Sequence, residues 1–496
     1  MTQLSDSLEQ NGSGQEPERT DSEALIEKKV AGRVGKTYQQ VIRDDGDEIP
    51  DFMRPSWADL GDEDIPISRY TSREFLELEV EHVWRKTWQM VCREEEIPEP
   101  GDHIVYEIVN DSFIITRTQS GEIKALQNAC LHRGRRLRAN DGKVPEFRCP
   151  FHGWSWQLDG EIKRLPCSEW DFKHVDREKF SLPEAKVGTW GGFVFINMDP
   201  DCEPLEDFLA PIPEHFKHVG YEARFKSAHV AQVVSANWKV ALEAFIEAYH
   251  LPETHPQTAP NIQDYMSQVD LFGKNVNRIL SARGVSSSTL GELEEEDIYE
   301  SYLSARTFYE ERLGENPRDV PREMLEGLPE GMTARQRIIN TIREDLAPRL
   351  GLDLSSTPAY QLMDAVQYFV FPNFFPWDSG MTNICYRFRP NGEDPDSCIL
   401  EIFFLSPLPE GVPRPKPAEI HWLERDGDWL NAPELGNLSA VVNQDRINMP
   451  QVQRGLKALQ RTKSGITIAS YQESRIRHFH ARLTDYIEGR VKSTTE

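Results

Sequence analysis

The segment from residue 130 to residue 152 reads CLHRGRRLRANDGKVPEFRCPFH and contains two Cys–His pairs. Cys130 and His132 form the first pair, Cys149 and His152 form the second, and 16 residues separate the pairs. The 496-residue chain has only seven cysteines, an odd and sparse count that does not indicate a disulfide framework. The two pairs therefore indicate a metal site. The alternative is two core cysteines and two structural histidines.

The order of the four side chains distinguishes between metals. A Cys2His2 set suits tetrahedral zinc, but a zinc finger usually groups Cys with Cys and His with His. Here each pair brings one thiol and one imidazole, which suits a [2Fe-2S] cluster with both thiolates on one iron and both imidazoles on the other. The segment resembles the Rieske motif C-x-H-x(16)-C-x-x-H, including R-G after the first His and G-W after the second. The resemblance implies that Cys130, His132, Cys149 and His152 bind a Rieske cluster.

Strand-like sequence surrounds the two pairs. The stretch VYEIVNDSFIITRTQSGEIKALQNAC leads up to the site, and WGGFVFINMD follows it. We therefore expect the cluster at the tip of a small antiparallel β domain. A Rieske cluster transfers one electron at a time and makes no bonds itself, so a second site should use the electrons.

A second group of ligand-type residues lies in NWKVALEAFIEAYHLPETHP, residues 237–256. The segment predicts a helix as far as His250, in which Glu243, Glu247 and His250 share one face. Pro252 should end this helix, and His255 should return from the following turn. Alanines surround the face, so it should be buried, and buried carboxylates require a metal or partners. The alternative is a solvated acidic face with an incidental His.

Two His and one carboxylate form the facial triad of non-haem Fe(II) oxygenases. The segment resembles the N-W-K…D-x-x-H-x(4)-H motif of the Rieske non-haem iron oxygenases, the large α subunits of ring-hydroxylating oxygenases, and the resemblance runs from about residue 66 to the end. It implies that His250 and His255 bind a mononuclear iron. Glu247 stands where the family usually has an Asp that links a ligand His to a Rieske His of the neighbouring subunit. Members that act on quaternary ammonium compounds have Glu there, whereas Ala244 replaces a common Asn.

The third iron ligand should be a carboxylate further along the chain. Glu401 lies in the strand-like CILEIFFLSP, and Glu473 lies in a stretch that reads as a charged helix surface. Asp445 interrupts an apolar helical stripe in AVVNQDRINMPQVQRGL. The family's ligand Asp occupies such a segment, with Gln and Gly following, as Gln453 and Gly455 do here. We therefore predict Asp445 as the ligand, with an ordinary surface Asp as the alternative.

Three parts are expected along the chain. Residues 1–65 hold 16 acidic and 7 basic residues, which predicts an acidic tail that becomes an ordered arm near the core. Residues 66–225 should form the Rieske domain, which a helix over 71–88 leads into. Residues 226–496 should form the catalytic domain.

The catalytic part should combine strands with long helices. AVQYFVFPNFF, ICYRFRP and CILEIFFLSP read as strands, and NGEDPDS between the last two reads as a hairpin turn. Helices are expected over 237–250, 438–460 and 466–490. The resemblance implies a helix-grip fold, a curved antiparallel sheet wrapped on long helices, so the expected class is α+β. Residues 285–358 are charged and helix-rich, and form either a solvated helical insertion or a lid over the substrate channel.

Charge and hydropathy limit the kinds of binding partner and the cellular compartment that the sequence predicts. The formal net charge of −26 argues against nucleic acid or an anionic membrane and favours a basic docking protein. No apolar run approaches the roughly 20 residues that a membrane-spanning helix needs. The N-terminus lacks the basic start and apolar run of a signal peptide, so we expect a cytoplasmic protein.

By this resemblance the chain is a terminal oxygenase that uses Rieske-delivered electrons and O2 at a mononuclear Fe(II). It should mono- or dihydroxylate, or oxidatively demethylate, an apolar substrate of the aromatic or polycyclic kind. The chain shows no G-x-G-x-x-G after a strand and no further cysteine cluster, so electrons should come from NAD(P)H through a separate reductase, with or without a ferredoxin. The family arrangement implies a homotrimeric ring, with or without a small β subunit.

Three other functions stay open on the sequence. A quaternary ammonium compound could be the substrate, held by an aromatic cage. The chain could be a Rieske electron carrier without oxygenase activity, or a zinc-stabilised binding protein. Aromatic residues expected near the substrate, with ordinary core packing as the alternative for each, are Phe245, Tyr249, Phe371, Phe374, Phe375 and Trp377.

Overall fold

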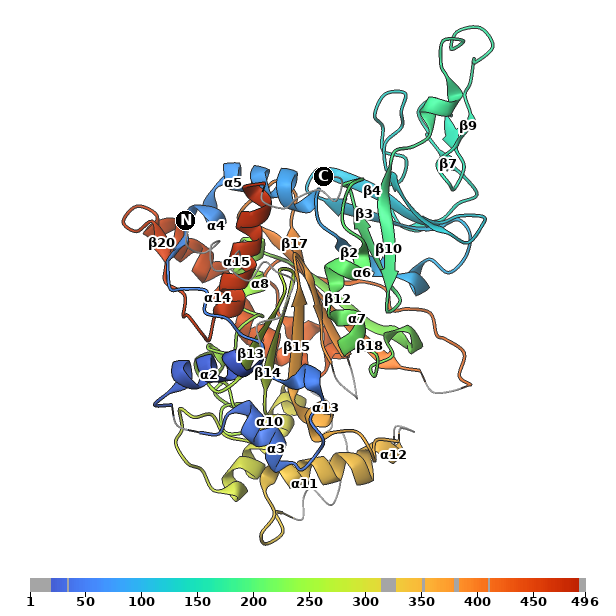
Figure 1. The fold of residues 1–496 in the computed structure, drawn as a ribbon. Coiled ribbons are helices and arrows are strands. Elements are labelled where there is room, and N and C mark those ends of the chain that lie inside the picture. The colour runs from blue at the N-terminus through green and yellow to red at the C-terminus, as the bar shows by residue number, and fades with distance from the viewer. Residues whose placement is uncertain are drawn as a thin grey trace.

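Two large β-sheets organise the chain (Figure 1). The computed structural model describes residues 19–33, 35–313, 327–349, 353–378, 383–408 and 411–489. One sheet has seven strands and lies in the N-terminal half, and the other has eight strands and lies in the C-terminal part. Among the described residues, no helix combines the length and the apolar character that crossing a bilayer requires.

The seven-stranded sheet has the strand order β2-β11-β10-β5-β4-β3-β6 and is antiparallel. A three-stranded sheet, β7-β8-β9, extends from it as a narrow tip (Figure 1). Phe147, Trp154 and Trp156 of this tip are buried in an apolar cluster that also includes Ile114 and Leu126 of the seven-stranded sheet. The strands are β2 (Gln89–Arg93), β3 (Asp102–Ile108), β4 (Asp111–Arg117), β5 (Ile123–Gln127), β6 (Gly142–Lys143), β7 (Phe147–Arg148), β8 (Ser155–Trp156), β9 (Ile162–Arg164), β10 (Glu184–Trp190) and β11 (Phe193–Asn197).

The eight-stranded sheet has the order β13-β14-β15-β16-β17-β18-β12-β19, and β12 and β19 form its parallel pair. Strands β17 and β18 pair as far as Pro390 and Cys398, so NGEDPDS forms the hairpin turn that the sequence predicts. The strands are β12 (Arg224–Val234), β13 (Gln268–Phe272), β14 (Val276–Ser281), β15 (Ala365–Val370), β16 (Phe374–Pro376), β17 (Asn383–Pro390), β18 (Cys398–Pro407) and β19 (His421–Leu423).

Helices α8 (Trp238–Glu243), α14 (Asn437–Leu459) and α15 (Ser474–Ile487) lie against this sheet (Figure 1). Their apolar side chains join those of the sheet in one buried cluster, which accounts for the stability of the arrangement. The predicted α+β class, with a small β domain and a curved sheet packed on long helices, is confirmed.

The predicted helix boundaries are partly right. The helix expected over 438–460 matches α14, which continues through Pro450. The helix expected over 466–490 begins too early, because Gly465–Ile466 forms strand β20 and pairs with β1 (Ile65–Pro66). Residue 490 lies outside the described residues.

The N-terminal arm packs near the catalytic sheet and the helical insertion (Figure 1). Residues 1–18 of the expected acidic tail lie outside the described residues. Tyr38 is buried and donates a hydrogen bond of 3.1 Å to Asp364. The helix expected over 71–88 ends at Trp84, because the following residues lead into β2. Helices of this half are α2 (Arg19–Val30), α3 (Tyr38–Asp44), α4 (Ser68–Thr71), α5 (Arg73–Glu79) with a wider turn over Val80–Trp84, α6 (Leu205–Leu209) and α7 (Ile212–His215).

The helix-rich insertion has a small apolar core of its own, which includes Ile298 and Ile338. Arg335 joins the insertion to the arm, with Nη2 2.8 Å from Asp45 Oδ2 and Nη1 2.6 Å from Asp364 Oδ1. Residues 314–326 and 350–352 of the expected insertion lie outside the described residues. Its helices are α10 (Glu295–Leu313), α11 (Ala334–Thr341), a wider turn over Ile342–Leu346, α12 (Ala347–Arg349) and α13 (Ala359–Met363).

A buried ion pair joins the two large sheets. Glu401 on β18 is fully buried, and its carboxylate lies 2.6 Å from Arg387 Nη2 and 3.1 Å from Arg389 Nε. Arg387 also donates a hydrogen bond of 2.6 Å to the carbonyl of Val91 on β2. Although burial raises the pKa of Glu401, the two guanidinium groups hold it well below its usual range. Glu401 therefore acts as an internal counter-ion.

Replacing Glu401 with Ala should lower the free energy of unfolding by about 3–5 kcal/mol, because two buried guanidinium groups would lose their counter-ion. Glu419→Ala is the matched control, since Glu419 is exposed and pairs only with Lys416 at the surface, and it should change stability little. Chemical or thermal unfolding of both variants measures the difference. Equal stability of the two variants would contradict the structural role assigned to Glu401.

Candidate metal centres and substrate cavity

The first ligand segment begins at helix α8, which buried polar contacts hold in place. The side chain of Asn237 caps the helix by accepting a hydrogen bond from the Lys239 backbone. Lys239 Nζ lies 2.5 Å from Glu79 Oε1, and Trp238 Nε1 donates to the same carboxylate at 3.1 Å. All three side chains are buried. The start of the ligand segment is therefore fixed against helix α5.

The prediction of one helix as far as His250 is wrong. Helix α8 ends at Glu243, turns cover the next residues, and the short α9 (Leu251–Thr254) follows. The Glu247 carboxylate accepts hydrogen bonds from the backbone N–H groups of Tyr249 and His250. A carboxylate bonded to nearby backbone donors competes with helical hydrogen bonding, which explains the break.

Because of the break, Glu243 does not share a face with Glu247 and His250. Its carboxylate instead accepts a hydrogen bond of 3.0 Å from Tyr70 and lies 2.7 Å from His480 Nε2. Burial is the main cause that raises the pKa of Glu243, to about 8. Burial also lowers the pKa of His480 well below its usual range, so the pair is neutral at pH 7.

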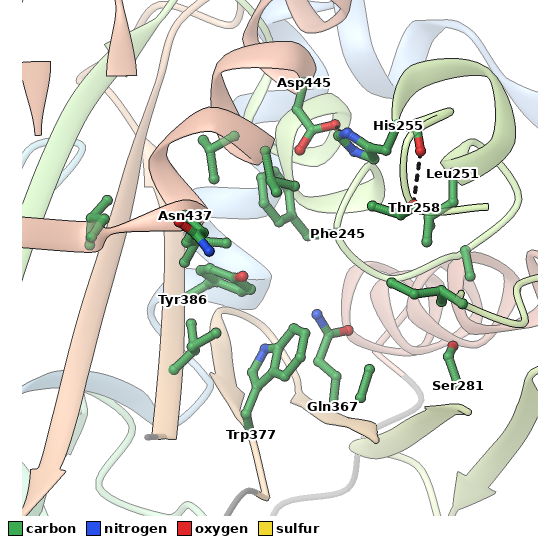
Figure 2. A pocket seen from close by; sticks show the side chains of 18 of the residues that line it. Phe245, Leu251, His255, Thr258, Ser281, Gln367, Trp377, Tyr386, Asn437 and Asp445 are labelled. Carbon is green, nitrogen blue, oxygen red and sulfur yellow. Dashed lines mark hydrogen bonds and ion pairs between the residues drawn. The ribbon is translucent and has the colours of Figure 1, made fainter. Parts of the chain in front are cut away.

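Three of the predicted iron ligands converge. His255 Nε2 lies 3.0 Å from Asp445 Oδ1, and His250 Nε2 lies 3.6 Å from the same oxygen. One ligand atom from each of the three residues lies within 4.8 Å of the others. Figure 2 shows Asp445 of α14 and His255 pointing toward each other at one end of the cavity. This set matches the 2-His-1-carboxylate arrangement that suits Fe(II).

Hydrogen bonds orient both imidazoles. His255 Nδ1 lies 2.8 Å from Gln444 Oε1, and His250 Nδ1 lies 2.5 Å from Glu247 Oε1. Since each Nδ1 meets an oxygen acceptor, each Nε2 faces Asp445 and can bind a metal. Burial lowers the pKa of His250, but the hydrogen bond to Glu247 and the charge of Asp445 raise it to about 9 overall. A metal would therefore displace a proton from His250.

The two other carboxylate candidates lie elsewhere. Glu401 binds arginines in the sheet, as described above. Glu473 accepts a hydrogen bond of 2.7 Å from the Ala469 backbone at the start of α15. Neither side chain belongs to the group formed by His250, His255 and Asp445.

The two Cys–His pairs lie on adjacent turns of the narrow tip. The N–H of Gly134 donates to the Cys130 carbonyl at 2.8 Å, and the N–H of Gly153 donates to the Cys149 carbonyl at 3.0 Å. The rings of His132 and His152 are 4.6 Å apart between centroids. The structure thus brings together all four residues that the motif singles out.

These four residues fit a [2Fe-2S] cluster. His132 Nδ1 is buried and has no hydrogen-bond partner in the described part of the chain, as expected of an atom that binds a metal. The His132 ring stacks on Trp154 at 5.0 Å, which fixes its orientation. Burial raises the pKa of the Cys130 thiol, so its thiolate requires a positive partner such as iron.

A cavity of about 780 Å³ lies beside the three candidate iron ligands (Figure 2). Phe245 and Trp377 line it, as the sequence predicts. The other predicted wall residues do not. Tyr249 is 49% exposed and stacks on Tyr265, and the remaining three are buried in the core, namely Phe371, Phe374 and Phe375.

Sequence reasoning missed several cavity residues. Ile279, Ser281 and Arg283 point into the cavity from the end of β14, and Ala365 and Gln367 from the neighbouring β15. Their spacing of two residues is the signal that could have found them, because alternate side chains of a strand share one face. Tyr386 on β17 and Tyr302 on α10 also line the cavity. Helix α10 thus contributes to the wall, in agreement with the lid interpretation of the insertion.

Two protein families match the chain. The Rieske [2Fe-2S] domain matches residues 87–175, and the ring hydroxylating alpha subunit (catalytic domain) matches residues 215–489. The first match covers both Cys–His pairs, and the second covers His250, His255 and Asp445.

Individual relatives match shorter parts. The carnitine monooxygenase oxygenase subunit of Acinetobacter pittii (strain PHEA-2) is 32% identical over 202 residues, which are 39% of this chain and 53% of the relative. The biphenyl 2,3-dioxygenase subunit alpha of Rhodococcus jostii (strain RHA1) is 30% identical over 215 residues, 40% of this chain and 47% of the relative. The chain thus spans about half the length of these relatives.

Solved structures share the fold over most of the chain. A quaternary ammonium Rieske monooxygenase in complex with L-carnitine has a TM-score of 0.59 at 19% identity, covering 85% of this chain and 95% of its own. Naphthalene 1,2-dioxygenase from Rhodococcus sp. bound to indole has a TM-score of 0.57 at 20% identity, covering 92% and 98%.

Because of the Glu243–His480 pair, we expect the free energy of unfolding to depend on pH. The folded state holds the Glu243 proton more tightly than the unfolded state does. The stability that this proton provides is therefore complete below the ordinary carboxyl pKa and is lost as pH rises toward 8. Glu243→Gln mimics the protonated carboxyl. Its stability relative to the wild type should therefore rise by roughly 1.4 kcal/mol per pH unit between about pH 5 and 8.

Unfolding measured at several pH values in that range tests this expectation. Glu253→Gln is the control, because Glu253 is exposed on α9 and its difference from the wild type should not change with pH. A constant difference between Glu243→Gln and the wild type would show that Glu243 is ionised in the folded protein.

Proposed function

The chain belongs to the ring-hydroxylating oxygenase α subunits, which are Rieske non-haem iron oxygenases, and from this we propose that it is the terminal oxygenase of a multicomponent system. The observation that carries the proposal is the convergence of His250, His255 and Asp445 at the end of a 780 Å³ cavity. When bound, the mononuclear iron and the [2Fe-2S] cluster supply O2 activation and single electrons, respectively.

The protein's own residues have separate tasks. Cys130, His132, Cys149 and His152 would hold the cluster, and His250, His255 and Asp445 would hold the mononuclear iron. Glu247 and Gln444 orient the two imidazoles through their Nδ1 atoms. The apolar wall excludes water from the reacting substrate. The seven-stranded sheet ends at Asn197 and the eight-stranded sheet begins at Arg224, so the expected division after residue 225 falls at the start of β12, which supports a Rieske domain over 66–225 and a catalytic domain over 226–496.

Within one chain the two sites lie far from each other in the fold. The second Cys–His turn connects β7 to β8 of the narrow tip, and the cavity is lined by residues of β14, β15 and α14. Figure 1 shows β7 and β9 well away from β15 and α14. Phe151 and Trp170 of the tip are 57% and 71% exposed, which suits a surface that another chain covers. A head-to-tail ring would bring one subunit's tip to its neighbour's cavity. We therefore propose a homotrimer, with or without a β subunit.

We infer that Glu247 connects the two sites across such an interface. Its carboxylate holds His250, and the adjacent Tyr249 is 49% exposed, so this turn reaches the surface. A carboxylate there can accept a hydrogen bond from a Rieske His of the neighbouring subunit.

The electron donor and the substrate are also proposed from chemistry. A net charge of −26 suits a basic docking face on a reductase or ferredoxin that carries electrons from NAD(P)H. Phe245, Trp377 and Tyr386 give the cavity an aromatic wall. Such a wall suits an aromatic or polycyclic substrate for hydroxylation, and equally a quaternary ammonium compound for oxidative demethylation.

Asp445→Ala should remove the mononuclear iron and abolish turnover, because two imidazoles alone hold Fe(II) weakly. The reduced Rieske EPR signal should persist, and iron should fall from about three to about two atoms per chain. Arg454→Ala, at an exposed position further along α14, is the control. Iron content, EPR and mass spectrometry of products formed from ¹⁸O2 measure these outcomes. A wild-type protein with only two irons would instead support an electron carrier.

Glu247→Gln should retain both metal sites and lose most turnover, by about 10–100-fold, because it weakens the link between them. Glu247→Asp should keep a measurable part. The rate of electron transfer out of the reduced cluster, followed by its absorption, should fall with turnover, whereas Glu253→Gln should match the wild type. Wild-type rates in Glu247→Gln, or a fully active monomer by sedimentation, would refute the coupling across subunits.

A further inference from the structure

Arg283 is a cation in the wall of the substrate cavity. It follows β14, and Ile279, Ser281 and Arg283 all line the cavity because they alternate along the chain. The guanidinium lies close enough to Tyr386 to lower the pKa of the Tyr386 hydroxyl, which burial otherwise raises. Asp445 acts on the same hydroxyl in the opposite direction. Tyr386 lines the same cavity as Asp445 and Arg283.

The Arg283 guanidinium has no counter-ion among the described residues. Its Nε is buried and has no hydrogen-bond partner. Two fully buried arginines of this domain are paired with carboxylates, Arg278 with Asp270 at 2.6 Å and Arg387 with Glu401 at 2.6 Å. The buried Arg475 is held instead by the amide oxygens of Asn277 and Gln367. Arg283 is half-buried and lines the cavity, so a ligand in the cavity can supply the anionic partner that its guanidinium lacks.

The backbone holds Arg283 in place. Its N–H donates to Asp364 Oδ1 at 3.0 Å, and its carbonyl accepts a hydrogen bond of 2.7 Å from Arg335 Nη1. Gly284 follows at φ +67°, where an added Cβ would lie 2.9 Å from the Arg335 Cα. Because hydrogen bonds fix the main chain on both sides of Arg283, ligand binding would cost little further backbone entropy.

A second donor faces the same cavity. Gln367 Oε1 accepts a hydrogen bond of 2.7 Å from the buried Arg475 Nη1, which leaves the amide nitrogen for the cavity. Figure 2 shows Gln367 pointing into the cavity beside Trp377. The cavity lining therefore offers a cation and an amide donor. Figure 2 shows Gln367 at the end of the cavity opposite Asp445 and His255.

We propose that Arg283 binds a carboxylate of the substrate. The planar guanidinium fork matches a carboxylate with two parallel hydrogen bonds. This inference rests on the proposed oxygenase function and narrows its substrate to an organic acid, whose apolar or methylated-ammonium body lies against Trp377 and Tyr386 and extends toward the iron ligands. Arg283 is thus a specificity-determining residue.

Binding to the iron-loaded protein tests this proposal without turnover. Isothermal titration under anaerobic conditions compares biphenyl-4-carboxylate with biphenyl-4-carboxamide, and L-carnitine with L-carnitine amide. In the wild type, a carboxylate should bind at least tenfold more tightly than its amide, the effect of about one charge-assisted hydrogen bond. Arg283→Gln should remove this preference, and Arg283→Lys should restore part of it.

Arg54→Gln, which changes an exposed arginine far from the cavity lining, should behave as the wild type. Retained iron content and Rieske spectrum show that each variant is folded. If no carboxylate binds the wild type more tightly than it binds Arg283→Gln, the proposal is wrong. If the proposed oxygenase function is wrong, the wild-type protein will contain two irons per chain in place of three and will form no O2-dependent product. That result is separate, because the preference for a carboxylate over its amide can still be measured by titration.

Discussion

The contact of 3.0 Å between Asp445 and His255 is the interaction on which the catalytic domain is arranged. The two residues come from distant segments, since the adjacent Gln444–His255 hydrogen bond spans 189 residues. One side chain ties these segments together. Gln453 of α14 accepts a hydrogen bond of 3.1 Å from the Asn237 N–H, at the cap of α8. It also donates to the Tyr70 carbonyl at 3.1 Å and to Asp396 at 2.7 Å. The helix that carries the carboxylate is therefore fixed to the start of the segment that carries both imidazoles.

The surroundings of two buried carboxylates explain their different roles. Glu401 lies between two guanidinium groups, which neutralise it permanently. Asp445 faces two imidazoles whose far nitrogens are hydrogen-bonded, so its charge remains available to a metal. A carboxylate is thus structural in the sheet, whereas a carboxylate on the helix is available to a metal. A metal between the three ligands would remove the cost of placing a carboxylate beside buried imidazoles.

The sequence predicted most of the candidate metal ligands. It predicted less well the secondary structure around them and the residues that line the cavity. The Cys–His pairs and the two His of the second segment were predicted from motifs that resemble those of the family, and Asp445 from the same resemblance and from the apolar stripe that it interrupts. The structure brings the members of each set together. The helix as far as His250 was wrong, since the bonds from Glu247 to backbone donors cannot be read from helical periodicity. Phe371, Phe374 and Phe375 are core residues, because an aromatic run on a strand does not tell which face meets a cavity. Arg283 went unnoticed, because its lack of a counter-ion is a property of the packed structure alone.

The cavity combines two kinds of restraint that act on one bound molecule. The candidate iron ligands converge at one end of the cavity, and the backbone contacts of Arg283 with Asp364 and Arg335 fix where a cation lies. Tyr386 lines the same cavity. A molecule anchored at Arg283 would present to the iron the carbon at a set distance from its carboxylate. Site selectivity would then follow from the length of the substrate body. The helical insertion contributes Tyr302 to the same wall and is held to the N-terminal arm through Arg335 and Asp45. Because Arg335 also fixes the backbone of Arg283, the arm, the helical insertion and the proposed carboxylate anchor form one connected support for the cavity wall.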